Sequence, residues 1–197
     1  MTYDVLIALL GFAFVTSVTP GPNNLMLIAS GVNFGFARTL PHMLGISLGQ
    51  AVMLFVVGVG LAGVLHSAPQ AVLALKLASL GYMLWLAWKI ATAAAPGQGR
   101  AGGVPFGFFQ AAAFQWVNPK AWAIALGATT AYAPNGDART MALISAVFVL
   151  VNLPSVSIWA AAGEGLRGWL ADPVRLRGFN WTMAALLVAS LLPVLWM

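Results

Sequence analysis

The sequence predicts an all-α, polytopic membrane protein, and three observations lead to this fold class. Hydrophobic residues make up 61% of the 197-residue chain, and charged residues make up only 7%. Soluble domains carry about 25% charged residues, so this composition cannot supply a water-facing surface. Several apolar runs approach the length of about 20 residues that a spanning helix needs. We therefore predict a single membrane domain that covers residues 1–197.

Six apolar runs predict six transmembrane helices. They cover approximately residues 5–34, 40–65, 70–94, 105–133, 138–162 and 174–196. The first run contains Pro20, Gly21 and Pro22 near its middle, and the fourth contains Pro119 at a similar depth. Proline interrupts a helix because it lacks an N–H and its ring clashes with the preceding turn. The first and fourth helices are therefore predicted to be broken.

The two breaks also suggest an internal repeat. The segment "VTPG" at residues 18–21 aligns with "VNPK" at 117–120, an offset of 99 residues. Each half of the chain then contributes three helices, so the second half must enter the membrane from the opposite side. This pattern is typical of inverted-topology repeats in secondary transporters. We predict repeat 1 over residues 1–98 and repeat 2 over residues 99–197.

Basic residues predict the orientation in the membrane, because loops rich in Lys and Arg stay in the cytoplasm. The loops after the first, third and fifth helices carry six of them, namely Arg38, Lys89, Arg100, Arg167, Arg175 and Arg177. The opposite side carries only Arg139 and Lys76. Both termini are therefore expected to face outward from a bacterial inner (plasma) membrane.

Polar residues gather at the two breaks and define a candidate substrate site. The set consists of Thr16, Thr19, Pro20, Gly21, Pro22, Asn23 and Asn24 in the first helix and Gln115, Asn118, Pro119 and Lys120 in the fourth. Backbone without helical hydrogen bonds is tolerated at membrane depth only where it meets protein or a water-filled cavity. Two such breaks at equivalent depth indicate a binding site at the centre of the membrane.

Lys120 is the one basic residue that we place near the middle of the bilayer. A charge at this depth costs several kcal/mol unless it is paired or hydrated, and the four acids of the chain lie near predicted membrane boundaries. Lys120 is then neutral, solvated by water and amides, held by carbonyls of the opposing break, or free to receive an anion. In the last case, a substrate carboxylate could pair with the Lys120 ammonium. The amide side chains could then bind the ammonium group of the same substrate. These features favour a small zwitterion, such as an amino acid, as the substrate.

Four residues outside the breaks are secondary candidates: His42, Gln50, Asn152 and Glu164. His42 could carry a proton or simply lie at the membrane interface, so proton coupling stays open. Glycine pairs at residues 31/35 and 45/49 allow close helix contacts in lipid. We expect these contacts within the monomer, with a homodimer as the alternative.

Composition excludes several other classes of protein. The chain has no cysteine, which rules out disulfides and thiol catalysis, and its two histidines and four acids are too scattered for a metal site. No cofactor and no enzyme activity are expected, because no nucleophile lies near a base. The net charge of +5 is spread over loop edges, which indicates topology rather than nucleic-acid binding. A divalent metal-ion exporter is the alternative function, but such sites need acidic oxygen ligands.

Two segments resemble the LysE/RhtB family of amino-acid exporters. They are "TPGPNNLMLIASGVNFGFARTLPHMLGISLG" and "WVNPKAW", and "TPGPNN" and "LAWKIA" are most similar to the cysteine and O-acetylserine exporter branch. The resemblance implies a secondary transporter for small neutral amino acids or derivatives, either cysteine/O-acetylserine-like or homoserine/threonine-like. It further implies export by alternating access, and it assigns site roles to residues 20–24 and 118–120.

Overall fold

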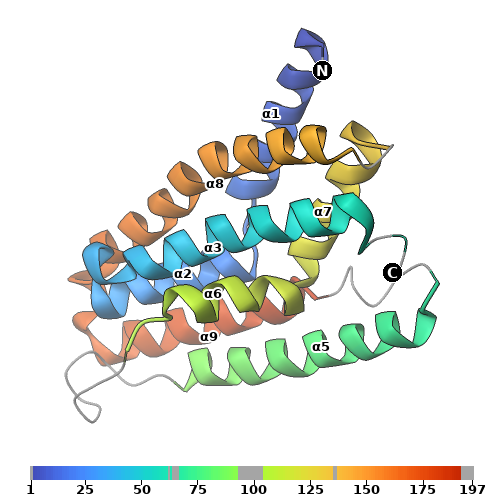
Figure 1. Cartoon of the computed structure of the whole chain (residues 1–197). Coiled ribbons are helices and arrows are strands. Elements are labelled where there is room, and N and C mark those ends of the chain that lie inside the picture. Colours follow the sequence, from blue (N-terminus) through green and yellow to red (C-terminus); the bar gives the residue numbers. More distant parts are fainter. Residues whose placement is uncertain (1, 62, 64–66, 93–103, 135–136, 192–197) are drawn as a thin grey trace.

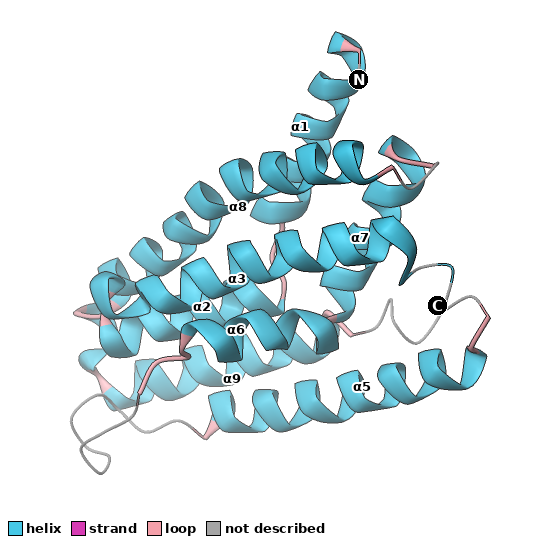
Figure 2. Ribbon diagram, in the orientation of Figure 1, coloured by secondary structure: helices cyan, strands magenta, loops and turns pink. Residues whose placement is uncertain are grey.

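A computed structural model describes residues 2–61, 63, 67–92, 104–134 and 137–191, and within these ranges it contains helices, turns and loops but no strand (Figure 1; Figure 2). The elements are α1 (Tyr3–Val18), α2 (Pro22–Phe34), α3 (Phe36–Val56), the π-helix η1 (Val57–Leu61), α5 (Pro69–Ala91), α6 (Phe108–Phe114), the 3₁₀ turn η2 (Gln115–Val117), α7 (Pro119–Tyr132), α8 (Ala138–Leu166), the 3₁₀ turn η3 (Trp169–Ala171) and α9 (Pro173–Ala189). Arg100, the predicted ends near residues 65 and 94, and the last residues of the sixth predicted span lie outside the described residues.

The first predicted helix is broken where its prolines indicated. α1 ends at Val18, α2 begins at Pro22, and their axes differ in direction by 52°. The N–H of Thr19 still bonds to Val15 O at 3.0 Å, and Gly21 then adopts an extended conformation. Pro22 suits the first position of a helix, because the N–H that it lacks would have no helical partner there. As a result, the N-terminal part of α1 projects away from the other helices (Figure 1).

The fourth predicted helix is broken as well. α6 tightens into η2, the backbone of Asn118 is extended, and α7 starts again at Pro119. The side chain of Asn118 caps the new helix by accepting the N–H of Lys120 at 3.1 Å. An asparagine cap followed by proline is a standard helix start. Both predicted breaks are therefore confirmed, each at the predicted proline.

The helices identify a membrane protein, although they do not establish all six spans. Residues Phe36–Leu61, Val72–Ala91 and Ala138–Leu166 are each long and apolar enough to cross a bilayer, and the bent pair α1–α2 can form a fourth span. α9 has 17 residues, fewer than the about 20 of a typical span, and α6–η2–α7 is interrupted. The arrangement as two inverted three-helix repeats stays a prediction.

Glycines allow the central helices to approach one another closely. A Cβ at Gly31 would collide with the backbone of Ala160 in α8, and one at Gly163 in α8 would collide with the backbone of Ile28 in α2. Gly45 and Gly49 of α3 lie in the same way against α6. The expected packing of Gly31, Gly45 and Gly49 within the monomer is confirmed, and it brings α2 against α8 and α3 against α6.

Candidate functional site

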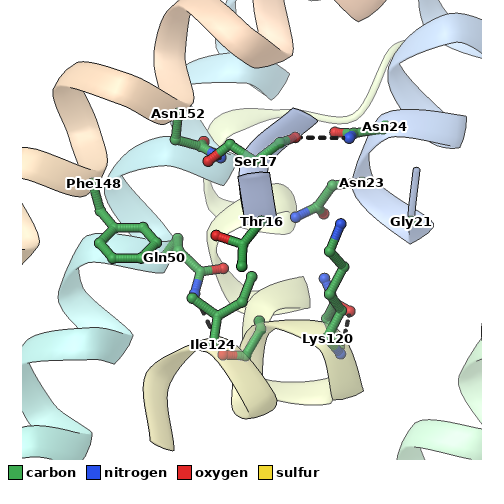
Figure 3. Close-up of a pocket in the computed structure, with 12 residues that line it drawn as sticks. Thr16, Ser17, Gly21, Asn23, Asn24, Gln50, Lys120, Ile124, Phe148 and Asn152 are labelled. Atoms are coloured by element: carbon green, nitrogen blue, oxygen red, sulfur yellow. Dashed lines mark hydrogen bonds between the residues drawn. The ribbon is translucent and has the colours of Figure 1, made fainter. Parts of the chain in front are cut away.

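A small cavity lies between the two breaks and is lined by side chains from five helices (Figure 3). Its lining consists of Thr16, Ser17, Gly21, Asn23, Asn24, Gln50, Asn118, Lys120, Ala121, Ile124, Phe148 and Asn152. The space open to the centres of water molecules is about 20 Å³. About 10–15 Å³ by this measure holds one water, so the cavity admits water but not an amino acid in this conformation.

Lys120 reaches across the cavity to the break in the first helix. Its Nζ donates to Thr19 O and, at 3.5 Å, to Pro20 O. A Cβ on residue 21 would lie 2.7 Å from Lys120 Cδ, so Gly21 leaves room for the lysine stem. Lysine held by carbonyls of the opposing break was one of the alternatives from the sequence, and the structure shows this contact. An ammonium carries three hydrogens, so two carbonyls leave one donor for another group.

A reciprocal pair of amides joins the two broken helices. Asn23 Nδ2 donates to Gln115 Oε1 at 2.9 Å, and Gln115 Nε2 donates back to Asn23 Oδ1 at 3.2 Å. Gln115 is fully buried and also donates to Ala111 O at 2.9 Å. Asn23 lines the cavity, and Gln115 lies behind it and fixes its orientation. The pair thus connects α2, which lines the cavity through Asn23, to the 3₁₀ turn η2 behind it.

The N-terminus of α2 offers backbone donors beside Lys120. Gly21 makes no side-chain cap for this helix, and the first backbone bond is from Leu25 N to Gly21 O. The N–H groups of Asn23 and Asn24 therefore have no helical acceptor, as is usual in a first helical turn. The side chain of Asn24 is occupied elsewhere, since Nδ2 donates to Ser17 O at 2.9 Å and to Thr19 O at 3.0 Å. These two bonds hold the end of α1 against the start of α2.

The secondary candidates divide into two groups. Gln50 and Asn152 line the cavity, while His42 and Glu164 do not. The ring of His42 is buried beside Phe106, with centroids 5.4 Å apart, and neither ring nitrogen has a hydrogen-bond partner among the described residues. Glu164 is exposed and its carboxylate lies near Gly35.

Several predicted residues shape the site without lining it: Thr19, Pro20, Pro22, Gln115 and Pro119. Thr19 and Pro20 contribute carbonyls, and the Thr19 hydroxyl donates to Val15 O inside its own helix. The sequence did not indicate Ser17, Ala121, Ile124 or Phe148. Ser17 lies in the turn next to a predicted break, which is a usable signal, whereas the three apolar residues carry none.

No carboxylate lines the cavity, and no group of three His, Asp or Glu side chains occurs among the residues that the structure describes. The donors and acceptors around the cavity are amides, hydroxyls, backbone groups and one ammonium. Such a set suits a small polar organic ion better than a divalent cation, which prefers several charged oxygen ligands.

Broken helices that meet around a polar cavity inside a bundle of apolar helices define the class of multi-pass membrane transport proteins. Residues 14–191 match the family model described as LysE type translocator. The chain belongs to the LysE family of translocators, as the resemblance of its two hallmark segments implied.

Curated relatives in this family cover most of the chain. A cysteine/O-acetylserine efflux protein of Escherichia coli K12 is 35% identical over 170 residues, which cover 83% of this chain and 85% of the relative. A protein of the same description from Klebsiella pneumoniae is 28% identical over 190 residues, 95% of each chain. No solved structure matches the chain. Membership of a family of translocators agrees with the expectation of a protein that is not an enzyme.

Proposed function

We propose that this chain is a secondary transporter that exports small neutral amino acids or their derivatives from the bacterial cytoplasm. The observation that carries the proposal is the position of Lys120, whose ammonium lies at the opened backbone of residues 19–21 and borders the cavity. The printed descriptions of the relatives support substrates such as cysteine and O-acetylserine. Homoserine- and threonine-like substrates are of the same size and charge.

The substrate carboxylate would bind between Lys120 and the start of α2. Lys120 Nζ keeps one hydrogen that neither carbonyl accepts, and the N–H groups of Asn23 and Asn24 lie at the positive end of the α2 dipole. Helix N-termini bind anions through such groups. The substrate ammonium would bind neutral oxygens of the lining, because that lining holds no carboxylate.

Export would proceed by alternating access around this site. The amide pair of Asn23 and Gln115 closes the cavity toward α2 and α6. Toward α1 and α7, Phe148 closes it and packs on Phe12 at 6.1 Å between ring centroids, and Phe12 contacts Tyr132 at 5.9 Å. In the described conformation the cavity is too small for an amino acid, so transport requires it to widen. Opening one side at a time would require the two predicted repeats to rock about the broken helices.

Counterflow by the purified protein in proteoliposomes tests the proposal. Vesicles loaded with an unlabelled amino acid should accumulate external labelled O-acetylserine, cysteine, homoserine or threonine. Labelled lysine and arginine serve as controls for charged side chains, and Mn²⁺ uptake tests the alternative of a metal-ion exporter. Exchange of Mn²⁺ with no exchange of any neutral amino acid would overturn the proposal. Repeating the assay with an imposed pH gradient addresses proton coupling, which stays open.

A further inference from the structure

The cavity has two chemically different ends (Figure 3). Lys120 and Asn23 lie at one end, where the proposed function places the charged groups of the substrate. Gln50, Phe148 and Asn152 lie at the other end, with Thr16 and Ser17 between. The second end has no role in binding a carboxylate, since it contains no cation and no free helix N-terminus. Its chemistry is that of two amides beside an aromatic ring.

Asn152 is held in place by hydrogen bonds to two other helices. Ser47 of α3 donates to Asn152 Oδ1 at 2.9 Å, and Asn152 Nδ2 donates to Ser17 Oγ of α1 at 3.2 Å. These partners lie 105 and 135 residues away in the chain. Each serine hydroxyl can donate or accept a hydrogen bond, so the amide stays bonded to both serines in either orientation. An amide nitrogen carries two hydrogens, and Ser17 accepts only one of them.

Gln50 complements Asn152 across this end of the cavity. Its Nε2 donates to Ala121 O at 3.4 Å, which leaves Oε1 without a hydrogen-bond donor among the described residues. The side chain extends into the cavity beside Phe148 (Figure 3). This end therefore offers two unused amide hydrogens, one on Asn152 Nδ2 and one on Gln50 Nε2, together with one unused amide oxygen and an aromatic wall. A short side chain with a hydroxyl group, which both donates and accepts, matches this combination.

We propose that Asn152 and Gln50 select the side chain of the substrate, with Ser17 and Ser47 as positioning residues for Asn152. This inference rests on the proposed function and assigns the specificity of that same site. The selected substrates carry a hydrogen-bonding group on a short uncharged side chain. A charged side chain is disfavoured, because the cavity lining contains no acid that would neutralise a second ammonium.

A matched pair of competitors in the counterflow assay tests this assignment. Homoserine and 2-aminobutyrate differ only by the terminal hydroxyl, so their ratio of inhibition constants isolates its recognition. Wild-type protein should prefer homoserine. Asn152→Leu and Gln50→Leu should each lower that preference by about 2- to 13-fold, the range for one neutral hydrogen bond. Affinity for 2-aminobutyrate should be retained.

Three further variants keep the result interpretable. Asn33→Leu makes the same change on α2, where Nδ2 bonds only Ala29 O of its own helix, and it should leave the preference unchanged. Ser47→Ala keeps both amides but frees Asn152 Oδ1, so it should weaken the preference with a smaller loss of melting temperature. If Asn152→Leu does not fold, Ser47→Ala provides the test of the Asn152 role in its place. Asn152→Asp replaces the amide N–H that would bond to the substrate hydroxyl with a carboxylate oxygen, which cannot donate. It should likewise reduce the preference for homoserine.

The outcomes separate this inference from the proposed function. Wild-type protein that exchanges amino acids but treats the two competitors alike would overturn the inference alone. Equal loss of affinity for both competitors in Asn152→Leu and Gln50→Leu would also overturn it, because that result would describe a merely structural role. Wild-type protein that exchanges no amino acid would overturn the proposed function, and this inference with it.

Discussion

Among single residues, Lys120 has the greatest consequence for function. It occupies the point where the two broken helices meet, and its ammonium satisfies carbonyls that the break leaves without helical partners. The same group supplies the positive charge of the cavity. One side chain therefore has a structural contact in the described conformation and a proposed contact with substrate, and a substitution can separate the two effects.

Lys120→Ala should reduce counterflow by at least about 10-fold, since hydrogen bonds to charged groups contribute about 1.5–3 kcal/mol. Its effect on stability should be small, because cavity water can solvate the released carbonyls. Counterflow in proteoliposomes and thermal unfolding in detergent measure the two effects. Thr130→Ala, which removes an exposed hydroxyl bonded only within α7, is the control. Normal counterflow by Lys120→Ala would contradict the carboxylate role.

The candidate site could be predicted from the sequence only where a residue is unusual for its surroundings. Prolines, amides and one lysine within apolar runs indicated both breaks and the contact between them. Ile124 and Phe148 could not be found in this way, since an apolar residue in an apolar helix can face a cavity, a neighbouring helix or lipid. The bonds of Asn152 to Ser17 and Ser47 depend on three helices far apart in the chain. Periodicity within one segment holds no information about them.

Among the elements, the contact of α2 with the 3₁₀ turn η2, which follows α6, is the one most suited to act as a gate beside the cavity. The Asn23–Gln115 pair connects the second half of one broken helix to the first half of the other. If these halves move apart during transport, both hydrogen bonds must break. Two neutral hydrogen bonds contribute about 1–3 kcal/mol in total, which is small enough for a reversible gate.

Fixing this pair should stop transport. The chain contains no cysteine, so Asn23→Cys with Gln115→Cys introduces two unique thiols at facing positions. A short bis-methanethiosulfonate reagent should join them and abolish counterflow, and a reductant should restore it. Each single-cysteine variant treated with the same reagent provides the control. A cross-linked double variant that exchanges substrate as fast as before treatment would show that α2 and α6 need not separate.

The contact of α2 with α8 should depend on Gly163, which lies against Ile28 just as Gly31 lies against Ala160. Gly163→Ala places a methyl group against the backbone of Ile28, which cannot move aside cheaply, and overpacking of this kind costs about 1–3 kcal/mol. Gly165→Ala, two residues further along α8, meets nothing within 4 Å and should be neutral or slightly stabilising by helix propensity. Thermal unfolding followed by circular dichroism compares them. Equal shifts in both variants would contradict the close α2–α8 contact.

The number of membrane crossings is a property of the complete chain, and it sets the orientation of each loop. The sequence predicted six segments, and helices occur in all six places. Among the residues that the structure describes, three helices and one bent pair have the length and apolar character of a span. Sequence patterns locate helices well because apolar runs are local. They do not establish whether an interrupted helix such as α6–η2–α7 crosses the bilayer, because this depends on how the broken halves pack.

Single cysteines at exposed positions near the ends of the predicted spans distinguish six spans from fewer. Thr2→Cys, Ala37→Cys, Pro134→Cys and Ala171→Cys each lie at the end of a predicted span, and all four native side chains are exposed. With six spans and the basic loops inside, a membrane-impermeant maleimide should label residues 2 and 134 in intact cells. Residues 37 and 171 should react only after permeabilisation. If α6–η2–α7 does not cross the membrane, residue 134 becomes internal and residue 171 external. That exchange of labels, with residues 2 and 37 unchanged, would overturn the inverted repeat while leaving the cavity and its lining as described.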